Sequence, residues 1–160
     1  MKLFLKSALF TLVAPGTFAG VIPFLLARDR TAGTGATLVL ASLLFAAGVA
    51  LYLRCAWDFA AFGRGTPAPI DQPKRLVTRG PYRFTRNPMY VAVMTVISAW
   101  AILFGGVLLW TWIVVAFVIF SQFIRHYEEP HLTRKFGEEY IAYMERVGRW
   151  LPPRVGRGSR

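Results

Sequence analysis

Residues 89–124 read MYVAVMTVISAWAILFGGVLLWTWIVVAFVIFSQFI and contain no Asp, Glu, Lys or Arg. Gly105-Gly106 divides this stretch into two apolar segments, Met89–Phe104 and Val107–Ile124, and each is nearly long enough to cross a hydrocarbon core of about 30 Å as a helix. Because only two residues separate the segments, we expect a tight antiparallel hairpin that packs as one unit. The sequence therefore predicts membrane helices here.

Two further apolar stretches precede this hairpin, Leu9–Ala27 and Ala36–Leu53, so four spans are the economical count. Pro15-Gly16 and Pro23 predict that the first span is bent, which membrane helices tolerate when neighbours satisfy the freed carbonyls. The predicted fold class is all-α: a polytopic membrane protein with about four transmembrane helices, forming a single domain over residues 1–160.

The first twenty residues also fit a secretory signal peptide, because Lys2 and Lys6 precede an apolar run that ends in small residues near Ala19. Apolar character resumes at once in Val21–Ala27. This continuity favours a retained span over a cleaved leader.

The composition agrees with a membrane protein, since 55% of the residues are hydrophobic and the mean hydropathy is +0.44. The formal net charge is nevertheless +11, from 19 Lys and Arg against 8 Asp and Glu. In a chain with long uncharged runs, such cations set topology and contact anionic headgroups. The expected partners are therefore membrane lipids, and no nucleic acid.

The basic residues are unevenly distributed along the chain. Seventeen of the 19 lie at the N-terminus, between the second and third spans, or after the fourth span, and these segments share one side of a four-span protein. The positive-inside rule then places both termini and the loop Arg54–Asn87 in the cytoplasm, together with almost every polar residue that could carry chemistry. We expect a multi-pass protein, of the bacterial inner membrane.

Two polar segments are predicted on that side. The stretch Gly63–Pro69 is rich in turn formers and is expected to be irregular. After the fourth span, apolar residues recur at helical spacing with charged residues on the other face, which predicts one amphipathic cytoplasmic helix against the membrane or the bundle. The apolar positions are Leu132, Phe136, Tyr140, Tyr143 and Val147.

Several familiar sites are excluded by residue spacing. Gly33-Thr34-Gly35 does not follow a strand, so it is no nucleotide-binding fingerprint. His126 and His131 are the only histidines and have no companion ligands at metal-binding spacing, so no metal is predicted. The single cysteine, Cys55, has no partner for a disulfide or a C-x-x-C site.

Polar residues at both ends of the hairpin could carry chemistry. Asn87 is a good N-cap and Pro88 suits a first helical turn, so an exposed helix N-terminus there would favour a carboxylate. Glu128 and Glu129 lie at the end of the fourth span, where uncompensated charge is costly. Their cationic partner could be Arg125 or the ammonium or sulfonium of a ligand. A headgroup-binding loop and a plain Arg–Glu surface cluster are the structural alternatives.

Three motifs in this order carry a resemblance to a known family: VTRGPYR at 77–83, RNPMY at 86–90 and, after the apolar hairpin, EEPHLTRKFGEEYIAY at 128–143. Together they resemble the isoprenylcysteine carboxyl methyltransferase and phospholipid methyltransferase superfamily. The resemblance covers about residues 66–152, and it is the combination of motifs that makes it specific.

The resemblance implies that S-adenosylmethionine is held between the loop before the hairpin and the segment after it. It also implies catalytic roles for Glu128, at the methionyl end of the cofactor, and for Arg125, on the acceptor side. The family commonly has His where this chain has Asn87, and Asn does not titrate near neutrality. The implied cofactor-binding residues are Lys74, Arg75, Leu76, Val77, Tyr82, Asn87, Pro88, Met89, Tyr90 and Glu128.

The implied reaction is direct transfer, in which a nucleophile attacks the methyl carbon and a neutral thioether leaves, without a metal. The expected acceptor is membrane-borne or lipophilic, resembling an isoprenylcysteine carboxylate or a phospholipid. Two alternatives stay open: methylation of a small soluble thiol or amine, and a non-catalytic membrane accessory protein that keeps the fold. Membrane sterol reductases resemble the family in their C-terminal half, but they have more spans than this chain can supply.

Overall fold

The computed structural model describes residue 13 and residues 15–63 and 75–151, and all the regular structure in these ranges is helical. The predicted all-α class is therefore confirmed for the described part of the chain. The elements are η1 (Thr17–Val21), α2 (Ile22–Ala27), α3 (Ala36–Asp58), η2 (Phe59–Gly63), η3 (Gly80–Arg83), α4 (Pro88–Phe104), α5 (Val107–Phe123), η4 (Ile124–Glu128), α6 (Glu129–Phe136) and α7 (Glu138–Arg146).

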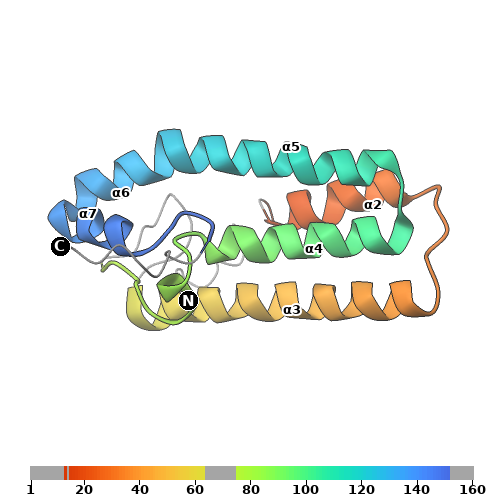
Figure 1. Cartoon of the computed structure of the whole chain (residues 1–160), viewed down its shortest axis with the longest axis horizontal. Helices are drawn as coiled ribbons and strands as arrows, with labels where there is room; N and C mark the ends of the chain where they lie inside the picture. The colour runs from red at the N-terminus through yellow and green to blue at the C-terminus, as the bar shows by residue number, and fades with distance from the viewer. Residues whose placement is uncertain (1–12, 14, 64–74, 152–160) are drawn as a thin grey trace, which may run out of the picture.

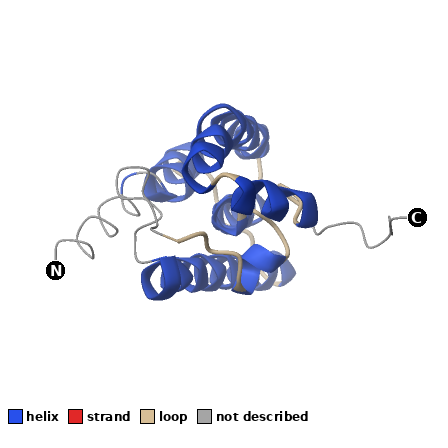
Figure 2. Ribbon diagram, turned by 90° about the vertical axis from the view of Figure 1, so that its left-hand side faces the viewer, coloured by secondary structure: helices blue, strands red, loops and turns tan. Residues whose placement is uncertain are grey.

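The three long helices form an elongated bundle. In Figure 1, α3, α4 and α5 run along the long axis, α2 lies near the turn between α4 and α5, and α6 and α7 lie at the opposite end. Figure 2 shows the bundle from that opposite end, with the helices surrounding α4. A core of buried apolar side chains lies between α4 and α5: Val93, Ile97, Ala116, Phe120 and Ile124.

A close approach of α3 to α4 depends on Gly48. A Cβ at this position would lie 2.7 Å from Val96 Cγ2 and 2.9 Å from the carbonyl oxygen of Ala92. Small residues at helix crossings are typical of membrane bundles, where packing rather than water exclusion drives association. The absence of a side chain at Gly48 therefore fixes how α3 lies against α4.

Two continuous helices are long and apolar enough to cross a membrane, Ala36–Phe62 and Val107–Phe136. Large apolar side chains are exposed along both, including Leu43 and Val114, and such surface is suited to lipid contact. The helices Thr17–Ala27 and Pro88–Phe104 are apolar but shorter. The protein is thus membrane-associated, while the count of four spans stays a prediction.

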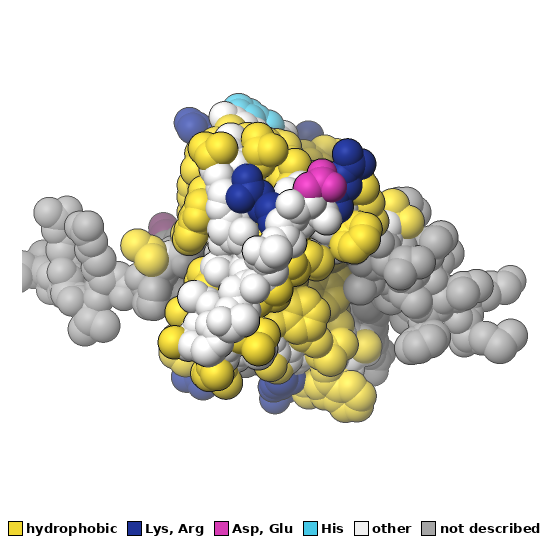
Figure 3. Space-filling model, turned by 90° about the vertical axis from the view of Figure 1, so that its right-hand side faces the viewer, with side chains coloured by type: hydrophobic (Ala, Val, Ile, Leu, Met, Phe, Trp, Pro, Cys, Tyr) yellow, Lys and Arg dark blue, Asp and Glu magenta, His cyan; other side chains and the backbone are white. Residues whose placement is uncertain are grey.

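The predicted helical hairpin is present. Helix α4 ends at Phe104 and α5 begins at Val107. The loop before α3 closes over this turn, because the Gly33 N–H donates to the Leu103 carbonyl over 2.6 Å and the Arg30 guanidinium occupies the space that a side chain at Gly106 would need. Figure 3 shows this end of the bundle, where hydrophobic side chains and loop backbone dominate and charged side chains are scattered.

The C-terminal region differs from the prediction of one amphipathic helix. The chain forms two helices, α6 and α7, which are separated by Gly137 at φ 54°. A left-handed residue ends a helix, so the apolar spacing continues across the break while the axis does not. Tyr140, Tyr143 and Val147 are nonetheless buried, and they pack on Leu76, Leu132 and Phe136.

Other expected features are only partly described. Pro15 and Gly16 lead directly into the π-helical segment η1, so the first helix is irregular, as its proline content predicts. Gly63 ends η2, and the rest of the predicted irregular stretch up to Pro69 lies outside the described residues.

Gly80→Ala is expected to destabilise the protein more than Gly35→Ala. Both glycines have φ 59°, a backbone angle that glycine adopts readily and that strains residues with a side chain. At Gly80 the new Cβ would also lie 2.5 Å from Asp58 Oδ2, whereas nothing lies within 4 Å at Gly35. Unfolding in detergent, followed by circular dichroism, measures both variants. Equal losses would show that Asp58 moves aside without cost.

Candidate functional site

A cavity of about 330 Å³ opens at the end of the bundle that carries α6 and α7. This volume lies at the lower end of the roughly 300–1,000 Å³ typical of small-molecule sites. Its walls come from η1, the end of α3, the loop before α4, the start of α4, and the segment from α5 to α7. All three motifs singled out in the sequence, at 77–83, 86–90 and 128–143, thus contribute to one cavity.

The structure brings most of the predicted cofactor-binding residues together. Those that line the cavity are Leu76, Val77, Tyr82, Asn87, Met89, Tyr90 and Glu128. Pro88 is buried at the start of α4 and does not line it. Arg75 and Arg125 are exposed and do not line it. Lys74 lies outside the described residues.

Glu128 places a buried carboxylate oxygen at the cavity wall. Its Oε2 has no hydrogen-bond partner within the described part of the chain, and the Tyr90 hydroxyl is positioned to donate to the carboxylate. Burying an anion without a compensating cation is unfavourable. Glu128 is therefore suited to bind a cationic group that enters the cavity.

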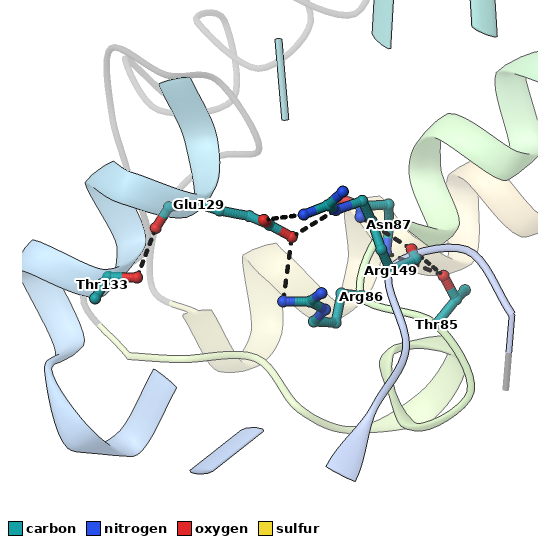
Figure 4. A network of polar contacts seen from close by, with 6 residues as sticks. All are labelled: Thr85, Arg86, Asn87, Glu129, Thr133 and Arg149. Carbon is teal, nitrogen blue, oxygen red and sulfur yellow. Dashed lines mark hydrogen bonds and ion pairs between the residues drawn. The ribbon is translucent and has the colours of Figure 1, made fainter. Parts of the chain in front are cut away.

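Both carboxylate oxygens of Glu129, by contrast, are paired with arginines of the protein itself. Its carboxylate lies 3.1 Å from Arg86 Nη1 and accepts hydrogen bonds from Arg149 Nε at 2.9 Å and Nη2 at 2.6 Å (Figure 4). The side chains of Arg86 and Glu129 are only 11% and 12% exposed. The cations beside the acidic pair are thus Arg86 and Arg149. For Arg125, the cation considered from sequence, the described residues show no ion pair.

Asn87 has a different contact from the one its N-cap position predicts. Helix α4 begins at Pro88 as expected, but the Asn87 side chain does not cap it. Its Nδ2 donates instead to the Arg149 carbonyl over 3.0 Å, and Thr85 Oγ1 donates to the same oxygen over 2.8 Å (Figure 4). The Arg86 N–H donates to the Gly148 carbonyl. These bonds fasten the segment after α7 to the loop before α4.

Three buried tyrosines of the site, Tyr82, Tyr140 and Tyr143, are neutral hydrogen-bonding groups. The Tyr143 hydroxyl donates to the Tyr82 carbonyl over 2.7 Å, which ties α7 to η3. Burial, reinforced by the charge of Glu129, raises the pKa of Tyr140 to about 12. Burial also raises the pKa of Tyr143 and Tyr82. These three side chains therefore stay protonated, and Glu128 is a cavity carboxyl group without an ion pair among the described residues.

Sequence reasoning missed several residues of the site. Arg86 lies inside the motif RNPMY, where its adjacency to Asn87 was the available signal. Glu129 was expected to need a cation, and the structure identifies Arg86 and Arg149 as its partners. Arg149 is twenty positions from its partner, and no local pattern connects them. The aromatic walls come from separate helices, and periodicity does not reveal which way each helix faces: Phe18, Tyr52, Phe59 and Phe120.

Comparison with known proteins adds independent information. The family model described as phospholipid methyltransferase matches residues 36–139. Over 63 residues the chain is 35% identical to an uncharacterized protein of Haemophilus influenzae, a stretch that is 39% of this chain and the whole of that relative. No solved structure shows a significant match to the chain. The family match spans α3, the loop before α4, the hairpin of α4 and α5, and the acidic pair Glu128 and Glu129.

Proposed function

The chain belongs to the phospholipid methyltransferase family, and we propose from this premise that it transfers a methyl group from S-adenosylmethionine to a lipophilic acceptor in the cavity. The single observation that carries the proposal is the buried Glu128 carboxylate, uncompensated within the described residues, on the wall of an otherwise mostly apolar cavity. A carboxylate in that environment fits a ligand with a cationic group.

The cavity residues fit the charges of S-adenosylmethionine. Glu128 would bind the methionyl ammonium through a charge-assisted hydrogen bond. Arg86 lines the same cavity, and its buried Nε has no acceptor among the described residues, so it is placed to bind the methionyl carboxylate. The rings of Tyr82 and Tyr90 offer faces that attract a sulfonium by about 0.5–2 kcal/mol. When bound, the cofactor supplies an electrophilic methyl carbon on sulfur.

The protein's own contribution is to align the reactants and exclude water. The contacts of Glu129 and Asn87 with Arg149 close the C-terminal segment over the loop that precedes α4. Holding two reactants in contact in this way accelerates transfer by proximity and orientation. A carboxylate or thiolate acceptor would react without a general base, whereas a protonated amine would first lose a proton.

The acceptor is proposed to enter from the lipid phase. Much of the cavity wall is formed by apolar residues of α4 and α5, including Val93 and Ile119. A lipophilic acceptor that slides in laterally avoids the cost of about 0.8 kcal/mol per CH₂ for leaving the bilayer. Arg125, exposed on η4, would hold an anionic headgroup or carboxylate of that acceptor at the membrane surface.

We further propose a multi-pass topology with four spans and with both termini and the cavity in the cytoplasm, because this places seventeen of the nineteen basic residues inside. In a Cys55→Ser background, a membrane-impermeant thiol reagent is expected to label Ser159→Cys only after the cells are opened. Thr34→Cys, in the opposite loop, is the matched control and should be labelled in intact cells. Labelling of Ser159→Cys from outside would overturn the topology.

Equilibrium binding of labelled S-adenosylmethionine to the detergent-purified protein tests the proposed function. Saturable binding at micromolar cofactor is expected, and it should be competed by the demethylated thioether product. Absence of binding at high micromolar cofactor, with the protein folded by circular dichroism, would instead favour a non-catalytic accessory protein.

A further inference from the structure

Two tryptophans hold the irregular first helix against the bundle. In η1 the carbonyl of Phe18 accepts a hydrogen bond from Trp112 Nε1 over 3.0 Å, and that of Ala19 accepts one from Trp100 Nε1 over 2.9 Å. Backbone carbonyls freed by a π-helical turn need partners inside an apolar medium. Because one indole belongs to α4 and the other to α5, this clamp fixes how Phe18 is presented to the bundle.

The ring of Phe18 begins a row of aromatic contacts that leads to Glu128. Its centroid lies 5.5 Å from that of Trp112 and 4.9 Å from that of Phe120, and Phe120 lies 5.0 Å from Tyr90. Tyr90 is the residue whose hydroxyl reaches the Glu128 carboxylate. Phe18, Phe120 and Tyr90 line the cavity, whereas Trp112 does not. Phe18 therefore separates the cavity from Trp112.

The positions of these residues along the helices give the cavity a polar and an apolar end. Phe120 precedes Glu128 by eight residues on the continuous α5–η4 helix, which corresponds to roughly 12 Å of helical rise. Glu128, Arg86 and Asn87 belong to the polar end. Phe18 and Phe120 belong to the end nearer the middle of the bundle.

We propose that Phe18 is a specificity-determining residue, which closes the apolar end of the cavity and so limits the length of the tail that an acceptor can insert. The inference rests on the proposed methyl transfer, and it adds the class of acceptor that is favoured: one whose apolar tail ends against this ring. A tail that is too short leaves the space beside Phe18 unfilled, and one that is too long meets the ring.

The test compares acceptors of graded tail length in Phe18→Ala and Phe18→Trp. The probes are phosphatidylethanolamines and N-acetyl-S-alkylcysteines, each as a series of increasing chain length, which also separates a lipid amine from a thioether carboxylate. Phe18→Ala is expected to raise kcat/KM for long relative to short tails by about tenfold or more, and Phe18→Trp to lower that ratio. Affinity for S-adenosylmethionine should stay unchanged.

Phe24→Ala is the matched control, because Phe24 lies on the adjoining helix α2 and is 59% exposed. In Phe24→Ala, kcat/KM should depend on the tail length of the acceptor as it does in the wild type. Identical profiles in Phe18→Ala, Phe18→Trp and the wild type, with wild-type melting, would overturn the inference while leaving the proposed function standing.

A second measurement does not require turnover. A phosphatidylethanolamine with a photoreactive group at the end of its acyl chain is crosslinked to the protein, and the adducts are mapped by mass spectrometry. Adducts are expected at Phe18 and Phe120 in the wild type, and at Trp112 in Phe18→Ala. Unchanged adducts would contradict the inference. A shifted adduct in a protein that transfers no methyl group would support it and count against the proposed function alone.

Discussion

Glu128→Gln is expected to weaken S-adenosylmethionine binding by roughly ten- to hundredfold. The substitution keeps the size of the side chain and removes the buried carboxyl group that faces the cavity and can pair with a cationic ligand. A hydrogen bond to a charged group contributes about 1.5–3 kcal/mol, and each 1.4 kcal/mol corresponds to about a tenfold change in affinity. Isothermal titration calorimetry on the detergent-purified protein measures the change.

Glu139→Gln provides the matched control for this experiment, since Glu139 is an exposed acid on α7 and does not line the cavity. Its affinity should equal that of the wild type. The folded state of Glu128→Gln is expected to be at least as stable as the wild type, because a neutral amide replaces a carboxyl group that is buried without an ion pair. Unchanged cofactor affinity in folded Glu128→Gln would return the acidic pair to a purely structural role.

Glu129→Gln, unlike Glu128→Gln, is expected to destabilise the folded state, by about 3–5 kcal/mol. Arg86 is 11% exposed and would lose its counter-charge, and breaking a buried ion pair on one side leaves the other charge uncompensated. The bidentate contact with Arg149, which fastens the C-terminal segment, would be lost as well. Denaturant unfolding in detergent measures the free energy of unfolding.

The control for Glu129→Gln is Asp29→Asn, which breaks an ion pair between side chains that are 67% and 85% exposed. An exposed pair contributes at most about 1 kcal/mol. Equal losses in the free energy of unfolding would show that the Arg86–Glu129–Arg149 cluster stabilises the protein no more than a surface ion pair does. The closure of the cavity by the C-terminal segment would then need another explanation.

Local signals made the hairpin and the order of the motifs predictable. The uncharged run with Gly105-Gly106 at its centre fixes two helices and their connection, because helix length and turn length both follow from the sequence. Tyr90, Asn87 and Glu128, which the family resemblance singled out at the ends of these helices, line one cavity, and their roles toward a cofactor stay predictions. Features encoded within a few residues are therefore the ones that reasoning from sequence recovered.

Features set by tertiary contacts were not predictable in this way. Neighbouring residues on a helix point about 100° apart, so adjacency does not tell that Glu129 meets two arginines while Glu128 faces the cavity. The Asn87 side chain bonds a carbonyl 62 positions away, and this contact displaces its expected cap. Apolar spacing from Leu132 to Val147 is continuous across Gly137, where only the backbone conformation shows the break.

Methyl transfer in cells tests the central claim most directly. Cells that express the wild type or Glu128→Gln, or that carry an empty vector, are grown with methyl-labelled methionine, and their lipid and small-molecule extracts are compared by mass spectrometry. The account predicts a labelled lipophilic product with the wild type that is absent from the other two cultures. Extracts with the same labelled species in all three cultures, while the wild type is present and folded in the membrane, would contradict it.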